Sequence, residues 1–571
     1  MTTGEPRHET WSDGAILSPG SPRYEQAFPT LTARDIDCVR HFAVARHYDD
    51  GAYIFEAGKP TPGMVVILSG HVSVTQHDGL GHVAPIVEQG PGQFLAEINE
   101  LAGRPALVDA RAEGNVEALL VSPSGLRALL AAEANLGERI MRALILRRVS
   151  LIQFNAGGPV LLGTPTASDM IRLQGFLSRN GYPYRVLDVL SDPEARDVVA
   201  RHAAGTASLP LVICPNGAVL SNPTEAELAR ALGMIGDGGS RPLYDVAVVG
   251  AGPAGLATAV YAASEGLSVV VLDARAYGGQ AGASARIENY LGFPTGISGL
   301  ALTGRAFAQA QKFGAEMMIP VEAKVLDCSR SDGALRLEVE GGSPIRAKTV
   351  VVASGARYRR LAVANLEQFE GRGVWYWASP IEARLCVNET VILVGGGNSA
   401  GQAAVFLSGH AAKIMMLVRD ANLAVSMSRY LIDRIAATPN IDVKFNTEVI
   451  ALEGSRETGL QRVRSRNRLT GVEVTDAVRN LFSFIGADPA TTWLEGCDVR
   501  LDQAGFVLTG DPHGGGRAGF SLETTVPGVY AVGDVRSGST KRVGAAIGEG
   551  AQVVQALHGH LANTSSSATK S

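Results

Sequence analysis

Cysteine is scarce in this 571-residue sequence: five are present, and no two lie close together. Such spacing signals neither a zinc site nor a disulfide framework, so we expect no metal centre. The chain opens without a basic and apolar leader, and it contains no uninterrupted apolar run of about 20 residues. These absences predict a reducing, cytoplasmic location and no membrane partner.

Charged residues are also few, at 19%, and their signs nearly balance, with 51 Lys and Arg against 56 Asp and Glu. No basic block stands out, so the electrostatic footprint of a nucleic-acid partner is missing. Hydrophobic residues reach 46%, enough to fill large cores. At roughly 100–200 residues per domain, the length predicts three or four domains.

Composition and periodicity predict a multidomain chain. Residues 1–27 and 562–571 are rich in small and polar residues and are expected to be flexible. Residues 28–153 show short alternating stretches with glycine turns, then helical spacing, which predicts an antiparallel β-roll with helices. Residues 157–236 read as a small α/β layer, and residues 243–561 as a larger α/β region.

The first glycine motif lies in the segment YDVAVVGAGPAGLATAVYAASEGLSVVVLDA. It reads strand, turn, helix, strand, and Gly250, Gly252 and Gly255 form G-x-G-x-x-G. These glycines allow a tight turn, close approach of backbone to a pyrophosphate, and close packing of helix and strand. Asp273 ends the next strand, where a carboxylate can accept from ribose hydroxyls. The segment predicts a dinucleotide site.

A second glycine motif lies in TVILVGGGNSAGQAAVFLSGHAAKIMMLVRD. Gly395 and Gly397 match the pattern, and Ala400 stands in the third position, an accepted variant. Arg419 ends the following strand and suits a 2′-phosphate, which favours NADPH over NADH. Asp420 follows immediately and argues the other way. Arg419 as a solvated strand end is the alternative.

Four further motifs in residues 243–561 carry a resemblance to the thioredoxin reductase family: GGQAGASARIENYLGFP, VVASGARYRRL, FSFIGADP and VYAVGDVRSGSTKRVGAAIGEGA. The resemblance implies an FAD domain in two parts, residues 243–365 and 481–561. An NADPH domain, residues 366–480, is inserted between them, and a homodimer is expected.

The loops and the resemblance together define the expected cofactor sites. Asp534 is expected to bond the ribityl chain of FAD, and Arg542 to lie near the pyrimidine edge of the flavin. The full FAD set is Gly250, Gly252, Pro253, Ala254, Gly255, Asp273, Ala274, Gly279, Gln280, Asn289, Ala353, Gly355, Gly533, Asp534, Arg542 and Val543. The NADPH set is Gly395, Gly397, Asn398, Ser399, Ala400, Arg419 and Arg429.

The sequence departs from this family at the redox-active C-x-x-C. Trp377 and Pro380 occupy the two cysteine positions, and Cys386 has no partner nearby in sequence. Thiol–disulfide exchange needs an attacking and a resolving thiol. The catalytic position is therefore assigned to Trp377 and Pro380 without thiol chemistry. Trp375 and Trp377 are interpreted either as flavin-packing residues or as ordinary core aromatics.

The N-terminal region resembles a cyclic-nucleotide-binding domain through GQFLAEINELAGRPALVDARA. The resemblance places Glu97 at the ribose 2′-hydroxyl. Ala106 replaces the phosphate-binding arginine, and one lost charge-assisted contact weakens binding by roughly 10- to 100-fold. We therefore expect cyclic-nucleotide binding to be weak or absent. Glu97 as a plain helix-turn carboxylate is the alternative.

The middle region, residues 157–236, resembles a thioredoxin or glutaredoxin fold. Leu209–Pro210 stands where such folds place a cis-proline. The loop GTPTAS lacks the C-x-x-C, which predicts a degenerate module for docking or spacing. Cys214 is expected to be a small buried hydrophobe.

These features predict an FAD-dependent oxidoreductase that takes hydride from NADPH and passes electrons to an unidentified acceptor, possible acceptors including a small redox protein. Two alternatives stay open. One is a redox- or nucleotide-sensing signalling or scaffold protein. The other is an NADP reductase acting on ferredoxin or flavodoxin.

Overall fold

The computed structural model describes residues 23–202, 208–235, 239–330, 333–510 and 522–568. The chain divides into two compact units. The first contains the described part of residues 1–164 together with residues 181–234, and the second contains residues 165–180 and the described part of 235–571. The predicted middle module is thus shared between the units. The predicted domain boundaries stay predictions.

Some expectations concern residues that lie outside the described ranges. The expected flexible N-terminus falls there up to residue 22. Among the described helices, none is long and apolar enough to cross a membrane.

A β-roll forms the first part of unit one, as predicted. The long strands β3 (Met64–His77) and β6 (Asp109–Val121) pair antiparallel at its centre. Alternating side chains of these strands pack against the helices that follow β6 in one buried cluster. The other elements are α1 (Tyr24–Ala27), α2 (Ala33–Arg40), β1 (Val44–Tyr48), β2 (Tyr53–Phe55), β4 (Val83–Gln89), β5 (Phe94–Leu95), the 3₁₀ helix η1 (Ile98–Leu101), α3 (Pro123–Ala132) and α4 (Ala134–Gln153).

A second sheet in unit one has the strand order β10-β9-β7-β8. β7 and β8 are parallel, whereas β9 is antiparallel to β7 and to β10. The Leu209–Pro210 peptide before β9 is cis, as expected. The elements are β7 (Val160–Gly163), β8 (Arg185–Asp188), α6 (Pro193–His202), β9 (Leu211–Ile213), β10 (Val219–Ser221) and α7 (Glu225–Ala231).

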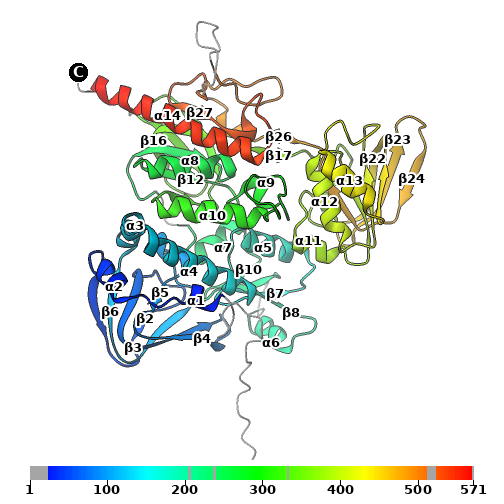
Figure 1. Ribbon diagram of the computed structural model, residues 1–571. Helices are drawn as coiled ribbons and strands as arrows, with labels where there is room; N and C mark the ends of the chain where they lie inside the picture. The colour runs from blue at the N-terminus through cyan, green and yellow to red at the C-terminus, as the bar shows by residue number, and fades with distance from the viewer. Residues whose placement is uncertain (1–22, 203–207, 236–238, 331–332, 511–521, 569–571) are drawn as a thin grey trace, which may run out of the picture. The chain divides into compact units, whose positions relative to one another are not determined.

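Unit two is built on a seven-stranded sheet of order β13-β12-β11-β16-β15-β14, with β27 also paired to β16. Helices α8, α10 and α14 contribute to the buried cluster on one face, and Figure 1 shows α14 lying along α8. The elements are β11 (Tyr244–Val249), α8 (Pro253–Ser264), β12 (Val269–Leu272), α9 (Gly279–Gly282), α10 (Gly299–Lys312), β13 (Glu316–Met318), β14 (Ala323–Asp327), β15 (Leu335–Val339), β16 (Ile345–Val352), η3 (Thr492–Leu494), β27 (Val529–Ala531), η4 (Gly533–Val535) and α14 (Val543–Ala568).

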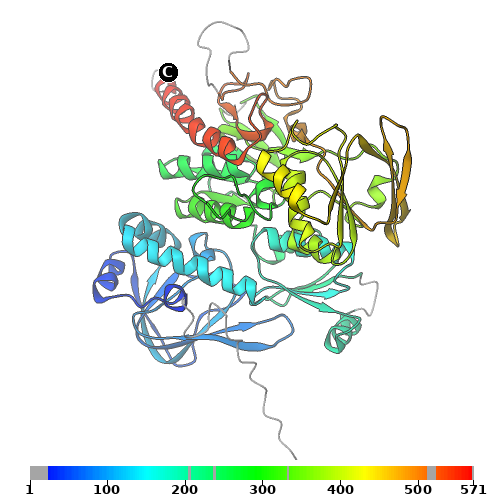
Figure 2. The ribbon, with the colours of Figure 1, turned by 45° about the vertical axis from the view of Figure 1, so that its right-hand side comes forward.

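A second parallel sheet in unit two has the order β18-β25-β19-β20-β21. Helices α12 and α13 pack together on one of its faces and are yellow in Figure 2. The antiparallel pair β17–β26 joins the chain segments that run between the two sheets. The elements are β17 (Ala356–Tyr358), η2 (Leu366–Gln368), β18 (Val374–Trp375), α11 (Pro380–Leu385), β19 (Thr390–Val394), α12 (Asn398–Ser408), β20 (Lys413–Leu417), α13 (Arg429–Ala437), β21 (Ile441–Lys444), β25 (Asn480–Ser483) and β26 (Ala487–Pro489).

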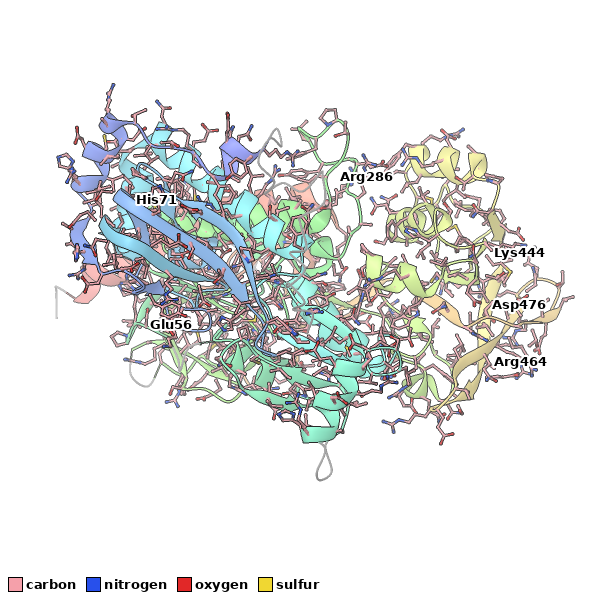
Figure 3. The ribbon with its side chains drawn as sticks, turned by 90° about the horizontal axis from the view of Figure 1, so that it is seen from below. Glu56, His71, Arg286, Lys444, Arg464 and Asp476 are labelled. Carbon is pink, nitrogen blue, oxygen red and sulfur yellow. A yellow bond between two sulfur atoms is a disulfide. The ribbon has the colours of Figure 1, made fainter. Side chains whose placement is uncertain are left out.

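A small antiparallel sheet follows β21: β22 (Thr447–Ser455), β23 (Gly459–Asn467) and β24 (Glu473–Asp476). Three arginines of β23, Arg462, Arg464 and Arg466, are exposed, and Arg464 on β23 and Asp476 on β24 are labelled in Figure 3.

The expected flexible tail at 562–571 stays a prediction, although part of it is helical. Helix α14 continues to Ala568, and only residues 569–571 lie outside the description. A helix that is already nucleated adds one hydrogen bond for each further residue, so weak helix formers can extend it. The Thr564 hydroxyl donates to the His560 carbonyl oxygen over 3.1 Å within this extension.

The expectation for the cysteines requires a correction. Cys328 and Cys497 form a disulfide, with Cα atoms 5.8 Å apart. Cys328 follows β14 and Cys497 follows η3, and both are half-buried beside the second cluster of the large sheet. The sequence separation of 169 residues hid this pair, since only the fold brings the two loops together. The expectation that no disulfide forms was therefore wrong.

We predict that a thiol reductant lowers the thermal midpoint of the oxidised protein by several degrees. A disulfide that closes a long loop typically stabilises by about 2–4 kcal/mol. The Cys328→Ser/Cys497→Ser variant should melt at the same temperature with and without reductant. A Cys38→Ser control should keep the response of the parent. A parent midpoint that does not move with reductant would contradict the pairing.

Candidate functional site

The first glycine loop joins β11 to α8 at the carboxyl edge of the large sheet. Gly250 has φ +113°, and a Cβ there would lie 2.1 Å from the Ala353 carbonyl oxygen. A Cβ on Gly255 would lie 1.8 Å from the Gly250 carbonyl oxygen. Larger residues at these positions would push β11, β16 and α8 apart. The two glycines therefore do what the motif predicts for turn and packing.

Gly252 differs because a Cβ there would meet only the Gly279 Cα, at 3.9 Å. The space in front of the α8 N-terminus is thus open, and Gly279 and Gly533 border it closely. No side chain caps the helix, and Pro253 is its first residue. Backbone N–H groups and the positive end of the helix dipole are available to a pyrophosphate. These residues fit FAD.

The two predicted carboxylates take different environments. Asp273 accepts hydrogen bonds from the Ala251 N–H over 2.9 Å and the Arg275 N–H over 3.0 Å, so it also braces the glycine loop. Burial raises the pKa of Asp534, while the Lys541 ammonium lowers it. Asp534 sits in η4, the element that precedes α14 in the chain. A role for either carboxylate toward ribose or ribityl hydroxyls stays a prediction.

The other predicted FAD residues flank the same loop to differing extents. The Gln280 amide donates to the Ala356 carbonyl oxygen, and Gly355 lies in the segment between β16 and β17. Asn289 and Arg542 are exposed. Ala274 follows Asp273, and Val543 is the first residue of α14. Asn289 is not among the residues lining the cavity described below.

The second glycine loop repeats this arrangement between β19 and α12. A Cβ on Gly395 would lie 2.4 Å from the Phe484 carbonyl oxygen, whereas nothing lies within 4 Å of one on Gly397. The Cβ of Ala400 lies 3.3 Å from the place that a Gly395 Cβ would take, so alanine fits the third position. Asn398 accepts the Ser428 N–H over 2.7 Å. The site fits a second dinucleotide.

The two predicted NADPH arginines differ in availability. Arg419 is exposed just beyond β20, where a 2′-phosphate is expected. Arg429 forms an ion pair with Asp433 at 2.8 Å on α13. Arg419 is therefore the better placed of the two for a phosphate. Its role stays a prediction.

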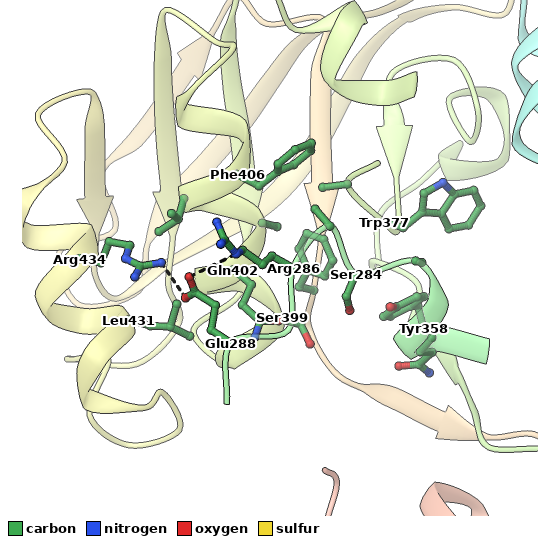
Figure 4. Close-up of a pocket in the computed structure, with 17 residues that line it drawn as sticks. Ser284, Arg286, Glu288, Tyr358, Trp377, Ser399, Gln402, Phe406, Leu431 and Arg434 are labelled. Atoms are coloured by element: carbon green, nitrogen blue, oxygen red, sulfur yellow. Dashed lines mark hydrogen bonds and ion pairs between the residues drawn. The ribbon is translucent and has the colours of Figure 1, made fainter. Parts of the chain in front are cut away.

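A cavity of about 320 Å³ in unit two is lined by residues of α9 and the segment after it, of α12 and of α13 (Figure 4). Gln280 from the first loop region, Ser399 from α12 and Trp377 from the dithiol position all line it. Tyr358 stands near Trp377, and burial raises its pKa to about 12. The predicted flavin, nicotinamide and dithiol positions therefore share one space.

Trp377 is held by contacts on several sides. Its indole N–H donates to Glu382 Oε1 over 3.0 Å, and Glu382 also accepts the Ser379 N–H over 3.0 Å. The Arg275 and Arg179 guanidinium groups lie 4.8 and 6.0 Å from the centroid of the Trp377 ring. Pro380 occupies the first turn of α11, where proline is favoured. At the dithiol position, a packed aromatic side chain therefore lines the cavity.

The two tryptophans, which were interpreted either as flavin-packing residues or as core aromatics, lie in different surroundings. Trp375 is buried in the core of the second sheet and donates to Asn480 Oδ1 over 2.9 Å. Trp377 lines the cavity instead. Cys386 is fully buried, and burial raises its pKa to about 12, which disfavours a reactive thiolate. Cys214 in unit one shows the same raised pKa, as expected of a buried hydrophobe.

Helix α5 (Ser168–Arg179) reaches this region within unit two. Ile171 joins the core cluster of the second sheet, and Arg179 donates to the Gly279 carbonyl oxygen over 2.9 Å. The Asn180 amide donates to the Arg275 carbonyl oxygen over 3.1 Å. A segment predicted to belong to the middle module thus supports the flavin loop.

An ion pair closes the other end of the cavity. Arg434 on α13 forms an ion pair with Glu288 Oε2 at 2.6 Å, and Arg286 lies 3.9 Å from the other Glu288 oxygen (Figure 4).

Glu549 on α14 also contacts a residue of the predicted FAD site, although the motifs did not reveal it. Its carboxylate accepts the Gly533 N–H over 2.6 Å. Only the fold brings these charges to the loops.

The cyclic-nucleotide cassette in unit one is occupied by internal contacts. Glu97 caps η1 and pairs with Arg148, whose Nη2 donates to Glu97 Oε2 over 2.9 Å. Arg148 also donates to Asn99 Oδ1 over 2.7 Å. Ala106 lines a nearby cavity of about 50 Å³, far below the roughly 300 Å³ of the smallest usual ligand pockets. Weak nucleotide binding stays the expectation.

Comparison with protein families identifies both parts of the chain. Residues 244–550 match the model of the pyridine nucleotide-disulphide oxidoreductase family, and residues 45–133 match that of the cyclic nucleotide-binding domain. The chain therefore belongs to the pyridine nucleotide-disulphide oxidoreductase family. The predicted fold class and the predicted class of enzyme are confirmed.

Individual relatives agree with this assignment. The chain is 34% identical over 310 residues to a thioredoxin reductase of Mycoplasmopsis pulmonis, covering 54% of this chain and 94% of that protein. It is 32% identical over 332 residues to an alkyl hydroperoxide reductase component of Pseudomonas putida, covering 58% of this chain and only 60% of that protein.

Solved structures show the same fold. A thioredoxin reductase from Lactococcus lactis aligns with a TM-score of 0.51 at 26% identity, covering 56% of this chain and 99% of that one. The thioredoxin reductase from T. acidophilum aligns with the same TM-score at 28% identity, with the same coverage.

We predict that Gly255→Ala abolishes flavin retention, because the new Cβ would collide with the Gly250 carbonyl oxygen and distort the loop. The flavin absorbance per chain of the purified variant measures this. Gly559→Ala is the matched control, since Gly559 is exposed on α14 with nothing within 4 Å of an added Cβ. Full flavin content in a folded Gly255→Ala protein would refute the assignment of this loop.

Proposed function

We propose that this oxidoreductase binds FAD at the first glycine loop and NADPH at the second, and that it passes electrons to an acceptor other than a local dithiol. The observation that carries the proposal is the shared cavity, which Gln280, Ser399 and Trp377 line together. Close placement of the reacting groups is what hydride transfer requires.

The chain's own residues bind and orient the two dinucleotides. N–H groups at the start of α8 receive the FAD pyrophosphate, and Gly252 leaves the room for it. The start of α12 does the same for NADPH, beside Gly397. When both are bound, NADPH supplies two electrons and a proton as hydride to FAD, and the acceptor then receives the two electrons.

The residues around Trp377 determine which acceptor chemistry is available. With Trp377 and Pro380 at the dithiol positions, neither provides a thiolate to attack a disulfide. Arg179 and Arg275 place positive charge on the same ring. We therefore favour a small redox protein, a quinone or oxygen as acceptor over thioredoxin itself. The β-roll of unit one would act as a regulatory module, and a homodimer is expected.

A steady-state assay tests the proposal directly. The purified protein is given NADPH with thioredoxin, ferredoxin, flavodoxin, a quinone or oxygen in separate reactions. Turnover with one of the last four, and none with thioredoxin, is expected. Turnover with ferredoxin or flavodoxin alone would select the NADP-reductase alternative. Absence of flavin reduction by NADPH would leave a sensing or scaffold role and refute the enzyme proposed.

We predict that Arg419→Ala lowers the preference for NADPH over NADH by about 10- to 100-fold, since a charge-assisted phosphate contact is worth about 1.5–3 kcal/mol. The ratio of kcat/KM for the two nucleotides measures it. Arg456→Ala, an exposed arginine on the turn between β22 and β23, is the control and should leave the ratio unchanged. An unchanged ratio in Arg419→Ala would assign discrimination elsewhere.

We predict that anaerobic titration with NADPH ends at two electrons per FAD, although a disulfide is present. In the strand register of the large sheet, Asp327, next to Cys328, lies opposite Arg336 on β15, and Arg336 lies opposite Arg346 on β16. From Arg346 to the carboxyl end of β16 at Val352 is roughly 20 Å at about 3.3 Å per residue. Neither disulfide cysteine lines the cavity.

Two variants make this titration decisive. Cys328→Ser/Cys497→Ser should give the same end point as the parent. Trp377→Cys/Pro380→Cys should raise it to four electrons per FAD, because a dithiol beside the cavity stores two more. A parent end point of four electrons that falls to two in the serine variant would show that the distant disulfide exchanges electrons with the flavin.

A further inference from the structure

A small cavity in unit one has no role in the proposed reductase reaction. It is lined by residues of β2, β3, β4, β5, η1 and α4 and of the loop before β6, and its volume is about 50 Å³. That is the space of roughly three to five water molecules at about 10–15 Å³ each. The cavity is thus too small for a nucleotide but large enough for a small organic molecule.

Two buried polar groups on its wall have no partner in the described part of the chain. Arg147 on α4 is 7% exposed, and its Nε and Nη1 donate to three backbone carbonyl oxygens at 2.8–3.0 Å. Its Nη2 has no hydrogen-bond partner among the described residues, and neither has Oε1 of Gln89, which is 2% exposed. Such groups in native proteins usually meet a ligand or water.

The charge of the cavity is unbalanced as well. Glu97 is engaged by Arg148. Burial, together with the neighbouring Glu97, raises the pKa of Glu100, which favours the neutral form of that carboxyl group. Burial lowers the pKa of Arg147 only to about 10, so it keeps its charge. A buried cation whose hydrogen-bond partners are neutral carbonyls favours an anion beside it.

The remaining walls are apolar. Phe55, Val74, Ile86 and Leu107 line the space, and the Phe28 and Phe94 rings lie 4.9 and 4.6 Å from the Arg147 guanidinium carbon. A phosphate dianion would face this apolar surface at a desolvation cost. A single carboxylate carrying a short aliphatic chain matches both parts of the wall.

We propose that this cavity binds a small aliphatic monocarboxylate, whose carboxylate accepts from Arg147 Nη2 and whose chain packs against Phe55, Val74, Ile86 and Leu107. The ligand class differs from a cyclic nucleotide in having neither a sugar nor a phosphate. Binding requires neither FAD nor NADPH, so it is independent of the reductase proposal.

Calorimetry on the full-length protein at pH 7 tests this with propionate and butyrate as the probes. Saturable binding of at least one acid is expected, and 1-butanol should bind at least about 10-fold more weakly, because it lacks the charge that Arg147 recognises. Ala106→Val narrows the cavity without touching a charge, and Arg147→Lys keeps the charge but loses Nη2. Each should weaken binding by about 10-fold or more.

Arg142→Gln is the matched control, because Arg142 lies on the same helix, exposed and paired with Glu138. It should bind the acids like the parent. No saturable binding of either acid would mean that the cavity holds water only and would overturn the proposal. So would equal binding of 1-butanol, unchanged binding in folded Ala106→Val, or displacement by inorganic phosphate or cyclic AMP at lower concentration.

Discussion

The reductase unit depends on one close approach of backbone to backbone, at Gly250. No side chain fits between this residue and the Ala353 carbonyl oxygen, 2.1 Å from where a Cβ would stand. The parallel pairing of β11 with β16 sets that distance. It also brings the N-terminus of α8 to the carboxyl edge of the sheet, where an open α/β sheet binds its ligand.

The second loop obeys the same constraint with more tolerance. Gly395 stands nearly as close to the Phe484 carbonyl oxygen, but the turn leaves room for the Ala400 methyl group where the first loop requires a glycine. Gln280 on α9 and Ser399 at the start of α12 line the same cavity. The same backbone device is thus present twice in unit two.

Internal contacts occupy two positions at which the resemblances in sequence place functional groups. These are the dithiol position of the reductase part and the nucleotide-binding cassette of the β-roll. At the dithiol position, Glu382 and two arginines hold the Trp377 ring in place of a thiol pair. In the β-roll, Arg148 pairs with the carboxylate of Glu97, and Ala106 lines only a small cavity. Each replacement keeps the fold and changes what the site can accept, because buried charges and rings already have partners.

The sequence by itself determined the two dinucleotide loops, the β-roll and the loss of the dithiol. Their signals are local: glycines at fixed spacing between a strand and a helix, or two residues where cysteines are expected. The Cys328–Cys497 bond, the Glu97–Arg148 pair and the support of the flavin loop by Arg179 were decided only by the tertiary structure. Their partners are far apart in the chain, and no periodicity of a single segment records which loops and helices the fold brings into contact.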